Sequence, residues 1–221
     1  MKVLSIDVET GGLTPETSLI EIGMVYADLD DPGPGAETRC ARIVFMHENL
    51  IITPYCCGLH TDLLNEIAKV HNAEWWTETI DEGYSYATVR AGEPEALSEH
   101  TTTYVTPEGG DKAMRQTLDL LEVDNWREQP VVIAGKSPVF DVGFLLANKC
   151  LEELRYHRRL MDPAILYAYP SDEVPPDLQT CLDRAAMTYT VSHTAVEDAR
   201  VVVYLLRKGL MPSNLGIKTL T

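Results

Sequence analysis

The stretch IDVETGGL, residues 6–13, ends an apolar run on two acids and follows them with a threonine and two glycines. Residues 2–9 have the pattern of a buried strand, and side chains two positions apart in a strand point to the same face. Asp7 and Glu9 are therefore expected to project side by side from one face of a sheet. A strand that simply ends in a solvated acidic turn is the plainest explanation of this pattern.

The pair of carboxylates also suits a cation. Two carboxylates this close repel each other, and both stay ionised only when a positive charge lies between them. Hard oxygen ligands favour Mg²⁺ or Mn²⁺, and glycines allow the backbone to approach a ligand closely. Metal binding is thus the second interpretation of the stretch, and other parts of the chain have to decide between the two.

The composition indicates one α/β domain. With 221 residues and 45% hydrophobic content, the chain is expected to form a single domain over 1–221 with a sizeable core. No apolar run reaches membrane-spanning length, and the first strand begins without the basic flank and cleavage site of a signal peptide. The five cysteines are an odd number without zinc-ligand spacing. These features predict a reduced, cytoplasmic protein that does not contact a membrane.

The charge balance limits the partners. Lys and Arg number 18 and Asp and Glu number 34, which gives a formal net charge of −16. A wide footprint on duplex DNA is disfavoured, because long polyanions are held mainly by Lys and Arg. A short nucleic-acid substrate held at a metal site remains compatible with this charge, and so does acidity that serves solubility alone.

The first part of the chain is predicted to be rich in strands. Residues 2–9, 18–29 and 42–46 have strand patterns, the Pro/Gly-rich residues 30–38 form a loop, and the order favours an antiparallel meander. Helical periodicity follows at 61–71.

Residues 73–110 are expected to be an insertion with short strands or irregular structure that caps the site as a lid. The pair Trp75-Trp76 could stack on a base, but adjacent tryptophans more often pack in a core or a lid, and we favour packing.

The second part alternates helices with a strand. A buried strand is predicted at 131–134. Helices are predicted at 111–122, with Asp111 as the cap, and at 140–150, 178–186 and 194–208. The helix at 140–150 is expected to have Phe144, Leu145 and Leu146 on its apolar side. The whole pattern favours a mixed sheet flanked by helices, in the α/β class.

Two later stretches place an acid near the start of a helix. In VVIAGKSPVFDVGFL, residues 131–145, a strand and a Gly/Ser/Pro turn lead to Asp141. In HTAVEDARVVVYLL, residues 193–206, His193 precedes the helix and Asp198 lies beside an apolar run. The helix macrodipole alone explains such acids, but a buried carboxylate needs a partner, which a metal would supply. A histidine at this place suits a base that takes a proton from water.

Taken in order, the three stretches read D-x-E, F-D-x-x-F-L and H-x-A-x-x-D-A. This order resembles the DEDDh 3′–5′ exonuclease superfamily, whose first motif, D-x-E-T-x-G-L, is similar to IDVETGGL. The matching positions run from 7 to 198 and span nearly the whole chain. The resemblance implies a ribonuclease H-like fold, in which the first three strands of a mixed sheet are antiparallel and the later ones parallel.

The resemblance also implies a set of roles. Two divalent ions, Mg²⁺ or Mn²⁺, would be held by four acids, and His193 would be the general base in a reaction that releases 5′-mononucleotides from a 3′ end. The backbone of Thr10 and Gly11 would meet the terminal nucleotide, and Leu13 would pack against its base. The four implied metal ligands are Asp7, Glu9, Asp141 and Asp198.

Local features are similar to the oligoribonuclease branch. GKSPVFDVGFL, residues 135–145, resembles that branch's G-N-S-x-x-Q-D-x-x-F-L, although Lys136 replaces its Asn and Phe140 its Gln; a Phe at that place is closer to proofreading DNA exonucleases. GLHTDLL, residues 58–64, is similar to its His-x-x-x-G-L segment, although a Leu replaces the Gly. The additional substrate contacts that this likeness implies are His60, Lys136 and Phe144.

The substrate expected from this likeness is single-stranded nucleic acid or short oligonucleotides. Few basic residues are placed to hold phosphates, and the candidates besides Lys136 are Arg155, Arg158 and Arg159. The alternatives are a proofreading or repair type of DNA exonuclease and a binding module that has lost catalysis. Some virus-encoded proteins look similar, so a phage-encoded chain acting in its host's cytoplasm is one expectation, and a homodimer is another.

Overall fold

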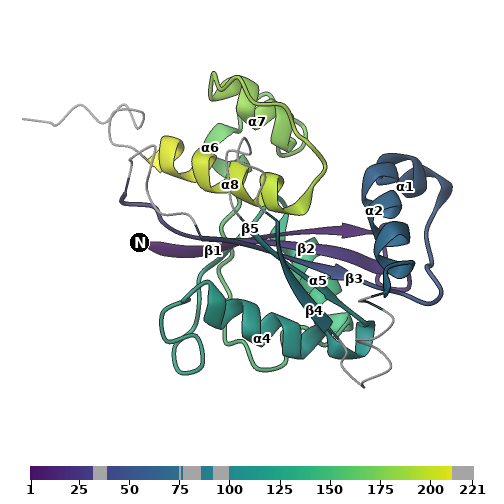
Figure 1. Ribbon diagram of the computed structural model, residues 1–221. Coiled ribbons are helices and arrows are strands. Elements are labelled where there is room, and N and C mark those ends of the chain that lie inside the picture. The colour runs from purple at the N-terminus through teal and green to yellow at the C-terminus, as the bar shows by residue number, and fades with distance from the viewer. Residues whose placement is uncertain (32–38, 75, 77–85, 92–99, 211–221) are drawn as a thin grey trace, which may run out of the picture.

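A six-stranded mixed sheet forms the centre of the molecule (Figure 1). The computed structural model describes residues 1–31, 39–74, 76, 86–91 and 100–210. The strands lie in the order β4-β5-β3-β2-β1-β6. Their bounds are Lys2–Thr10 for β1, Leu19–Asp28 for β2, Arg39–Phe45 for β3, Tyr86–Ala91 for β4, His100–Val105 for β5 and Ile133–Ala134 for β6.

The first three strands are antiparallel, as predicted. β1 pairs with β2, and β2 with β3, in antiparallel registers that place Glu9 opposite Glu21. The β1–β2 register then shifts between Glu9 and Thr10, where β1 ends. β6 lies parallel to β1 and β5 parallel to β3, so the α/β class with a mixed sheet is confirmed.

The predicted strand at 131–134 is shorter than expected. β6 contains only Ile133 and Ala134, while Val131 forms an isolated bridge with Tyr156. The reason is that the irregular segment after residue 154, rather than a regular strand, covers this edge, where the N–H of Val131 donates to the carbonyl of Arg155 at 2.9 Å.

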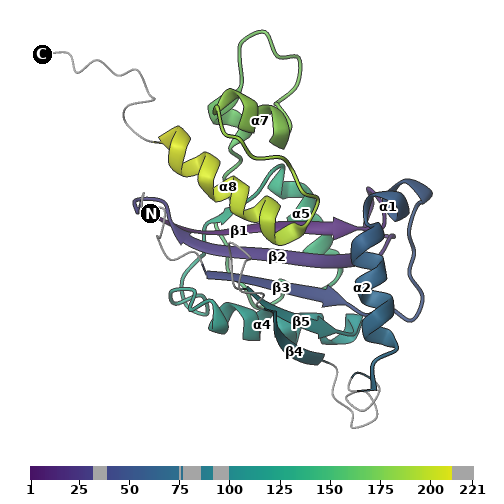
Figure 2. The same ribbon diagram turned by 45° about the horizontal axis from the view of Figure 1, so that its top comes forward.

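Helices cover both faces of the sheet (Figures 1 and 2). One face is covered by α8, which crosses β1 and β2 and carries α6 and α7 beside it, and the opposite face by α4 and α5. At one end of the sheet, α1 and α2 follow β3. Their bounds are Pro54–Leu59 for α1, Thr61–His71 for α2, Gly110–Leu120 for α4 after the 3₁₀ turn Pro107–Gly109, Pro138–Ala147 for α5, Ala164–Tyr167 for α6, Leu178–Arg184 for α7 and Ala195–Leu210 for α8.

Apolar side chains fill both layers between sheet and helices. On the α4/α5 side, Ile6 and Ile22 pack with Met114 and Phe144. On the α7/α8 side, Val3 and Val25 pack with residues of those helices, and a third cluster lies under α2 around Ile20 and Trp76. Trp76 is thus a core residue, as favoured from the sequence, while Trp75 lies outside the described residues.

Two local predictions on the helices are wrong. Asp111 does not cap α4, because the helix continues from the preceding 3₁₀ turn and its N-cap position is Gly109. Asp111 lies in the first turn and pairs with Arg115 at 3.1 Å. Leu146 was expected on the apolar side of its helix but is 51% exposed, since Phe144 and Leu145 already fill the layer under α5.

The segment 73–110 contributes two strands to the sheet. β5 pairs with β3 and β4 pairs with β5, so these strands extend the edge that lies opposite β6. Short strands were expected here. Of the lid expected over 73–110, residues 75, 77–85 and 92–99 lie outside the described part of the chain. Among the described helices, none is both long and apolar enough to cross a membrane.

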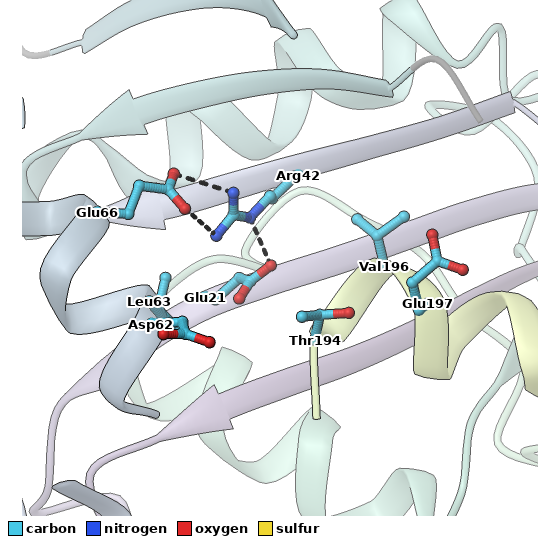
Figure 3. A pocket seen from close by; sticks show the side chains of 8 residues that line it. All are labelled: Glu21, Arg42, Asp62, Leu63, Glu66, Thr194, Val196 and Glu197. Carbon is cyan, nitrogen blue, oxygen red and sulfur yellow. Dashed lines mark hydrogen bonds and ion pairs between the residues drawn. The ribbon is translucent and has the colours of Figure 1, made fainter. Parts of the chain in front are cut away.

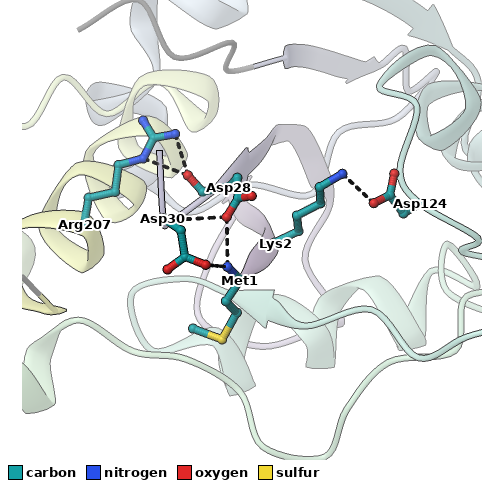
Figure 4. Close-up of polar contacts among 6 residues, drawn as sticks. All are labelled: Met1, Lys2, Asp28, Asp30, Asp124 and Arg207. Atoms are coloured by element: carbon teal, nitrogen blue, oxygen red, sulfur yellow. Dashed lines mark hydrogen bonds and ion pairs between the residues drawn. The ribbon is translucent and has the colours of Figure 1, made fainter. Parts of the chain in front are cut away.

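Ionic contacts fix the start of β1 at the far end of the sheet (Figure 4). The ammonium group of Met1 pairs with Asp28, at 2.8 Å, and with Asp30, while Lys2 pairs with Asp124 at 2.5 Å. Arg207, near the end of α8, donates to the carbonyl of Asp28 at 2.8 and 3.1 Å. β1 and α8 are therefore tied together at one end, and their acids lie toward the other.

Candidate metal centre

Three carboxylates from two distant parts of the sequence converge on one face of the sheet. Asp7 and Glu9 lie on the face of β1 that α8 covers, because Val3 on the same alternation packs in the α7/α8 layer. Asp198 comes from the first turn of α8. One carboxylate oxygen of each of the three lies within 4.8 Å of the others. Hard oxygen ligands at this spacing suit Mg²⁺ or Mn²⁺.

Asp198 reaches the sheet because α8 packs very closely against β2. Gly23 faces the start of the helix, and a Cβ atom on Gly23 would lie 2.0 Å from the backbone carbon of Ala195. The helix begins with the N–H of Asp198 donating to the carbonyl of Thr194 at 3.0 Å. The carboxylate of Asp198 accepts from the N–H of Ser192 at 3.4 Å, which holds it beside the turn before the helix.

Asp141 joins the site from the start of α5. Its Oδ1 atom accepts a hydrogen bond of 3.1 Å from the N–H of Val8, which lies between Asp7 and Glu9 on β1. Its Oδ2 atom is buried and has no hydrogen-bond partner among the described residues. Since buried polar atoms are normally paired, this oxygen fits a ligand for a cation held by the neighbouring acids.

The cluster resists full ionisation without a cation. Burial raises the pKa of Glu9 to about 8, and the charges of Glu21, Asp198 and Asp141 add to this shift. Burial likewise raises the pKa of Asp141 to about 7, although the N–H of Val8 opposes the shift. Burial, followed by the charges of Asp141 and Glu9, raises the pKa of Asp7 well above its usual range. A divalent ion would displace these protons, so the donor set fits a metal.

A partly buried ionic network borders the cluster on β2 and β3 (Figure 3). Glu21 lies opposite Glu9 and forms an ion pair with the Nε atom of Arg42 at 2.6 Å. The two remaining guanidinium nitrogens of Arg42 donate to both oxygens of Glu66 at 2.9 and 3.0 Å. The hydroxyl of Tyr104 also donates to Glu66, at 2.6 Å. Burial alone would lower the pKa of Arg42, but Glu21 and Glu66 raise it, so Arg42 stays charged.

The sequence interpretation missed this network. Its signal is an acid, Glu21, within the apolar part of the strand LIEIGMVYAD, two positions from Gly23. A cavity of about 210 Å³ lies above the network, between α2 and the start of α8 (Figure 3). Arg42, Glu66 and Thr194 are among its lining residues.

His60 does not lie where a substrate contact was expected. It stands between α1 and α2, is only 4% exposed, and its Nδ1 atom lies 3.6 Å from Oε2 of Glu9. Burial lowers the pKa of His60, and the nearby His193 lowers it further. The structure therefore brings His60 to a proposed metal ligand and encloses it there.

Residues at the end of β1 and in the loop after it differ in their exposure to solvent. The hydroxyl of Thr10 donates to the carbonyl of Gly12 at 2.6 Å, and Gly11 is buried against the backbone of Ile51. Leu13 is 85% exposed, so its side chain is free to contact a base. His193 is exposed just before α8 and has a left-handed backbone conformation, with φ of 54°.

Lys136 and Phe144 differ in their access to solvent. The ammonium group of Lys136 lies 3.0 Å from Oγ of Ser137 and 3.8 Å from a carboxylate oxygen of Asp162. Phe144 is 1% exposed and belongs to the core on the α4/α5 side, which corrects its expected place at the substrate. The ring of Phe140 lies 4.9 Å from that of Phe144 and is partly exposed.

The three arginines considered for phosphate binding are exposed, but Arg155 lies far from the acids. Its carbonyl accepts from Val131, and the parallel pairing of Leu4 with Ile133 places Val131 level with the start of β1. Asp7 lies five residues further along β1, which corresponds to a distance of about 16 Å. The expectation that Arg155 helps to hold phosphates at the acids is therefore wrong, because the sheet places it at the opposite end.

Comparisons with known proteins give weak similarity at the level of structure. No family model matches the chain, and no curated protein sequence matches it. Among solved structures, it is similar to the Saccharomyces cerevisiae apo Pan2 pseudoubiquitin hydrolase-RNA exonuclease module in complex with A7 RNA. The TM-score is 0.44 at 14% identity, over 94% of this chain and 28% of that chain. A similarity at this level carries no functional conclusion.

Proposed function

We propose that the chain is a metal-dependent 3′–5′ exonuclease of the DEDDh type, with a ribonuclease H-like fold. The observation that carries the proposal is the convergence of Asp7, Glu9 and Asp198 within 4.8 Å. Asp141, whose charge acts on Asp7, adds an Oδ2 atom without a hydrogen-bond partner among the described residues. The strand order, in which an antiparallel β1–β2–β3 unit is extended by parallel β6, is compatible with this fold.

In the proposed reaction the negative charges of four acids are balanced by bound metal ions. Asp7, Glu9, Asp141 and Asp198 would hold two Mg²⁺ or Mn²⁺ ions, which supply activation of the attacking water and stabilisation of the leaving oxygen. Val8 fixes Asp141 through its N–H, so this carboxylate keeps one oxygen for binding. His193 takes the proton of the attacking water from its exposed position before α8.

The substrate proposed is single-stranded nucleic acid or a short oligonucleotide, cut to 5′-mononucleotides. Exposed Leu13 packs against the terminal base, and the backbone near Thr10 and Gly11 meets the terminal nucleotide. The net charge of −16 and the remote position of Arg155 favour few phosphate contacts, since affinity for long strands depends on basic residues.

A proofreading type of DNA exonuclease is the second candidate. The partly exposed ring of Phe140, at the start of α5, favours it, because aromatic rings can stack on the bases of longer single strands. The two candidates differ in length dependence. An oligonucleotide-specific enzyme gains little efficiency beyond the first few nucleotides, whereas a proofreading enzyme remains active on long single-stranded DNA.

The test is hydrolysis of 5′-labelled RNA and DNA strands of two to thirty nucleotides with Mg²⁺, Mn²⁺ or a chelator. We expect stepwise shortening from the 3′ end, only with metal, and no activity in Asp198→Asn. Asp183→Asn, which changes an exposed acid of α7, is the matched control and should keep wild-type activity. Internal cutting of circular single strands, or cleavage that persists in the chelator, would overturn the proposal.

A further inference from the structure

The ring of His60 is held rigidly at the edge of the candidate metal centre. The N–H of His60 donates to the carbonyl of Cys56 at 2.9 Å, which closes α1. The carbonyl of His60 accepts from the N–H of Leu64, also at 2.9 Å, which opens α2. Because both helices hold its backbone and the residue is only 4% exposed, the side chain has little room to move away from Glu9.

The Nδ1 atom of His60 is buried and has no hydrogen-bond partner among the described residues. Buried polar atoms are rarely left unpaired, so such an atom in a folded protein needs an explanation. The atom opposite it is Oε2 of Glu9, at 3.6 Å. This distance is longer than an ordinary hydrogen bond, and a shift of well under 1 Å in the Glu9 side chain would close it.

Apart from the proposed metal ligands, Glu9 has two neighbouring side chains with different partners, Glu21 and His60. Glu21, directly opposite on β2, is held by Arg42 and is turned toward that guanidinium. His60 is the side chain that comes within ion-pair distance of Glu9 among the described residues. The orientation of the Glu9 carboxyl group thus depends on His60 rather than on the Arg42 network.

We propose that His60 is a positioning residue for Glu9. Its Nδ1 atom holds Oε2 of Glu9 and leaves the other oxygen for a divalent cation shared with Asp7 and Asp198. The inference rests on the proposed function, because it assigns Glu9 to a metal. It replaces the expected substrate contact, since a side chain that is 4% exposed cannot meet a nucleotide without displacement of α1 and α2.

The proposed role predicts different effects for different substitutions of His60. An asparagine side chain carries its polar atoms near the position of Nδ1, while a glutamine reaches only the position of Nε2. His60→Asn should therefore keep Glu9 in place, and His60→Gln and His60→Leu should not. Loss of a group that orients a metal ligand commonly weakens metal affinity or activity by about 10–100-fold.

The experiment measures Mn²⁺ affinity by electron paramagnetic resonance and, separately, kcat and KM for a short single strand. We expect Mn²⁺ affinity to fall about 10–100-fold in His60→Leu and His60→Gln and to be largely restored in His60→Asn. Unchanged affinity in His60→Leu, or equal affinity in the Asn and Gln variants, would overturn the inference. A raised KM with normal Mn²⁺ affinity would also overturn it, in favour of a substrate contact.

Two controls separate this inference from the proposed function. His47→Leu removes another partly buried histidine, whose Nε2 atom contacts the carbonyl of Leu19 at 2.6 Å, and it should leave Mn²⁺ affinity unchanged. Asp7→Asn should weaken Mn²⁺ binding if the metal centre exists. If Asp7→Asn binds Mn²⁺ as tightly as the wild type, the proposed function fails. If Asp7→Asn binds Mn²⁺ more weakly but the His60 variants bind it like the wild type, only the positioning role fails.

Discussion

Glu9 and Glu21 lie directly opposite each other on β1 and β2, and Arg42 pairs with Glu21 at 2.6 Å. The two neighbouring acids therefore have different environments. Glu21 is neutralised by a permanent cation from β3, whereas Glu9 lies with Asp7 and Asp198 in a group that has the spacing of metal ligands. The Arg42 network thus sets the boundary of the candidate metal centre.

Arg42→Met should destabilise the protein strongly. The change leaves Glu21 buried without its counter-charge, and breaking a buried pair in this way costs roughly 3–5 kcal/mol. Denaturant unfolding would measure the loss, and the double variant Glu21→Gln/Arg42→Met should recover a large part of it. Arg127→Met, which breaks the exposed pair with Asp119, is the control and should change stability by about 1 kcal/mol or less.

Gly23→Ala should disturb both stability and metal binding. A Cβ atom at this position would lie 2.0 Å from the backbone of Ala195, so α8 has to move away from β2 and take Asp198 with it. Overpacking of this kind costs about 1–3 kcal/mol. Gly143→Ala on α5, where an added Cβ meets nothing within 4 Å, should be neutral or stabilising. Equal melting temperatures and Mn²⁺ affinities for the two variants would contradict this account.

The stability of the metal-free protein should fall as pH rises from about 4.5 to about 8. Burial raises the pKa of Glu9 from 4.5 to about 8, so across this range the folded state keeps a proton that the unfolded state has lost. Unfolding then releases that proton, and rising pH favours the unfolded state. Melting in a chelator at pH 5, 6.5 and 8 would measure the trend.

Glu9→Gln provides the control for this pH dependence, because it removes the titrating group and keeps the shape of the side chain. Its melting temperature should depend less on pH over the same range. Added Mg²⁺ or Mn²⁺ should stabilise the wild type most at the high end of the range, where it no longer competes with the proton. A wild type and a variant with parallel pH profiles would refute the assignment of the shift to Glu9.

His193→Ala should lower kcat by about 10²–10⁴-fold while substrate affinity changes little, as expected for loss of a general base. The side chain is exposed and lies outside the packed layers, so the fold should not change. Single-turnover rates, together with substrate binding measured in the inactive Asp198→Asn background, separate the two effects. His157→Ala, another exposed histidine, is the control. A His193→Ala variant with normal kcat would exclude the proposed role.

Local patterns in the sequence were sufficient for the first three strands and for the face on which the first two acids lie. The alternation in residues 2–9 correctly placed Asp7 and Glu9 on one face, because side-chain direction in a strand depends only on position along it. The predicted helix at 61–71 has the observed bounds, since its apolar periodicity is uninterrupted.

Contacts between distant elements could not be predicted in the same way. The pairing of Glu21 with Arg42 depends on the β2–β3 register, which a single sequence does not determine. Phe144 was assigned to the substrate from a motif, but the direction of its side chain is set by the packing of α5 on the sheet. Asp111 was assigned as a cap because the 3₁₀ turn that precedes α4 has no clear sequence signal.

The docking of α8 on Gly23 also affects the order of events during synthesis. Asp7 and Glu9 leave the ribosome long before Asp198, which belongs to the last described helix and is positioned only when that helix packs on β2. Contacts this far apart in sequence form late, after a large loop has been closed. A growing chain therefore lacks the complete acidic cluster until α8 has left the ribosome and packed on β2. Nuclease capacity, as proposed here, would arise only after that step.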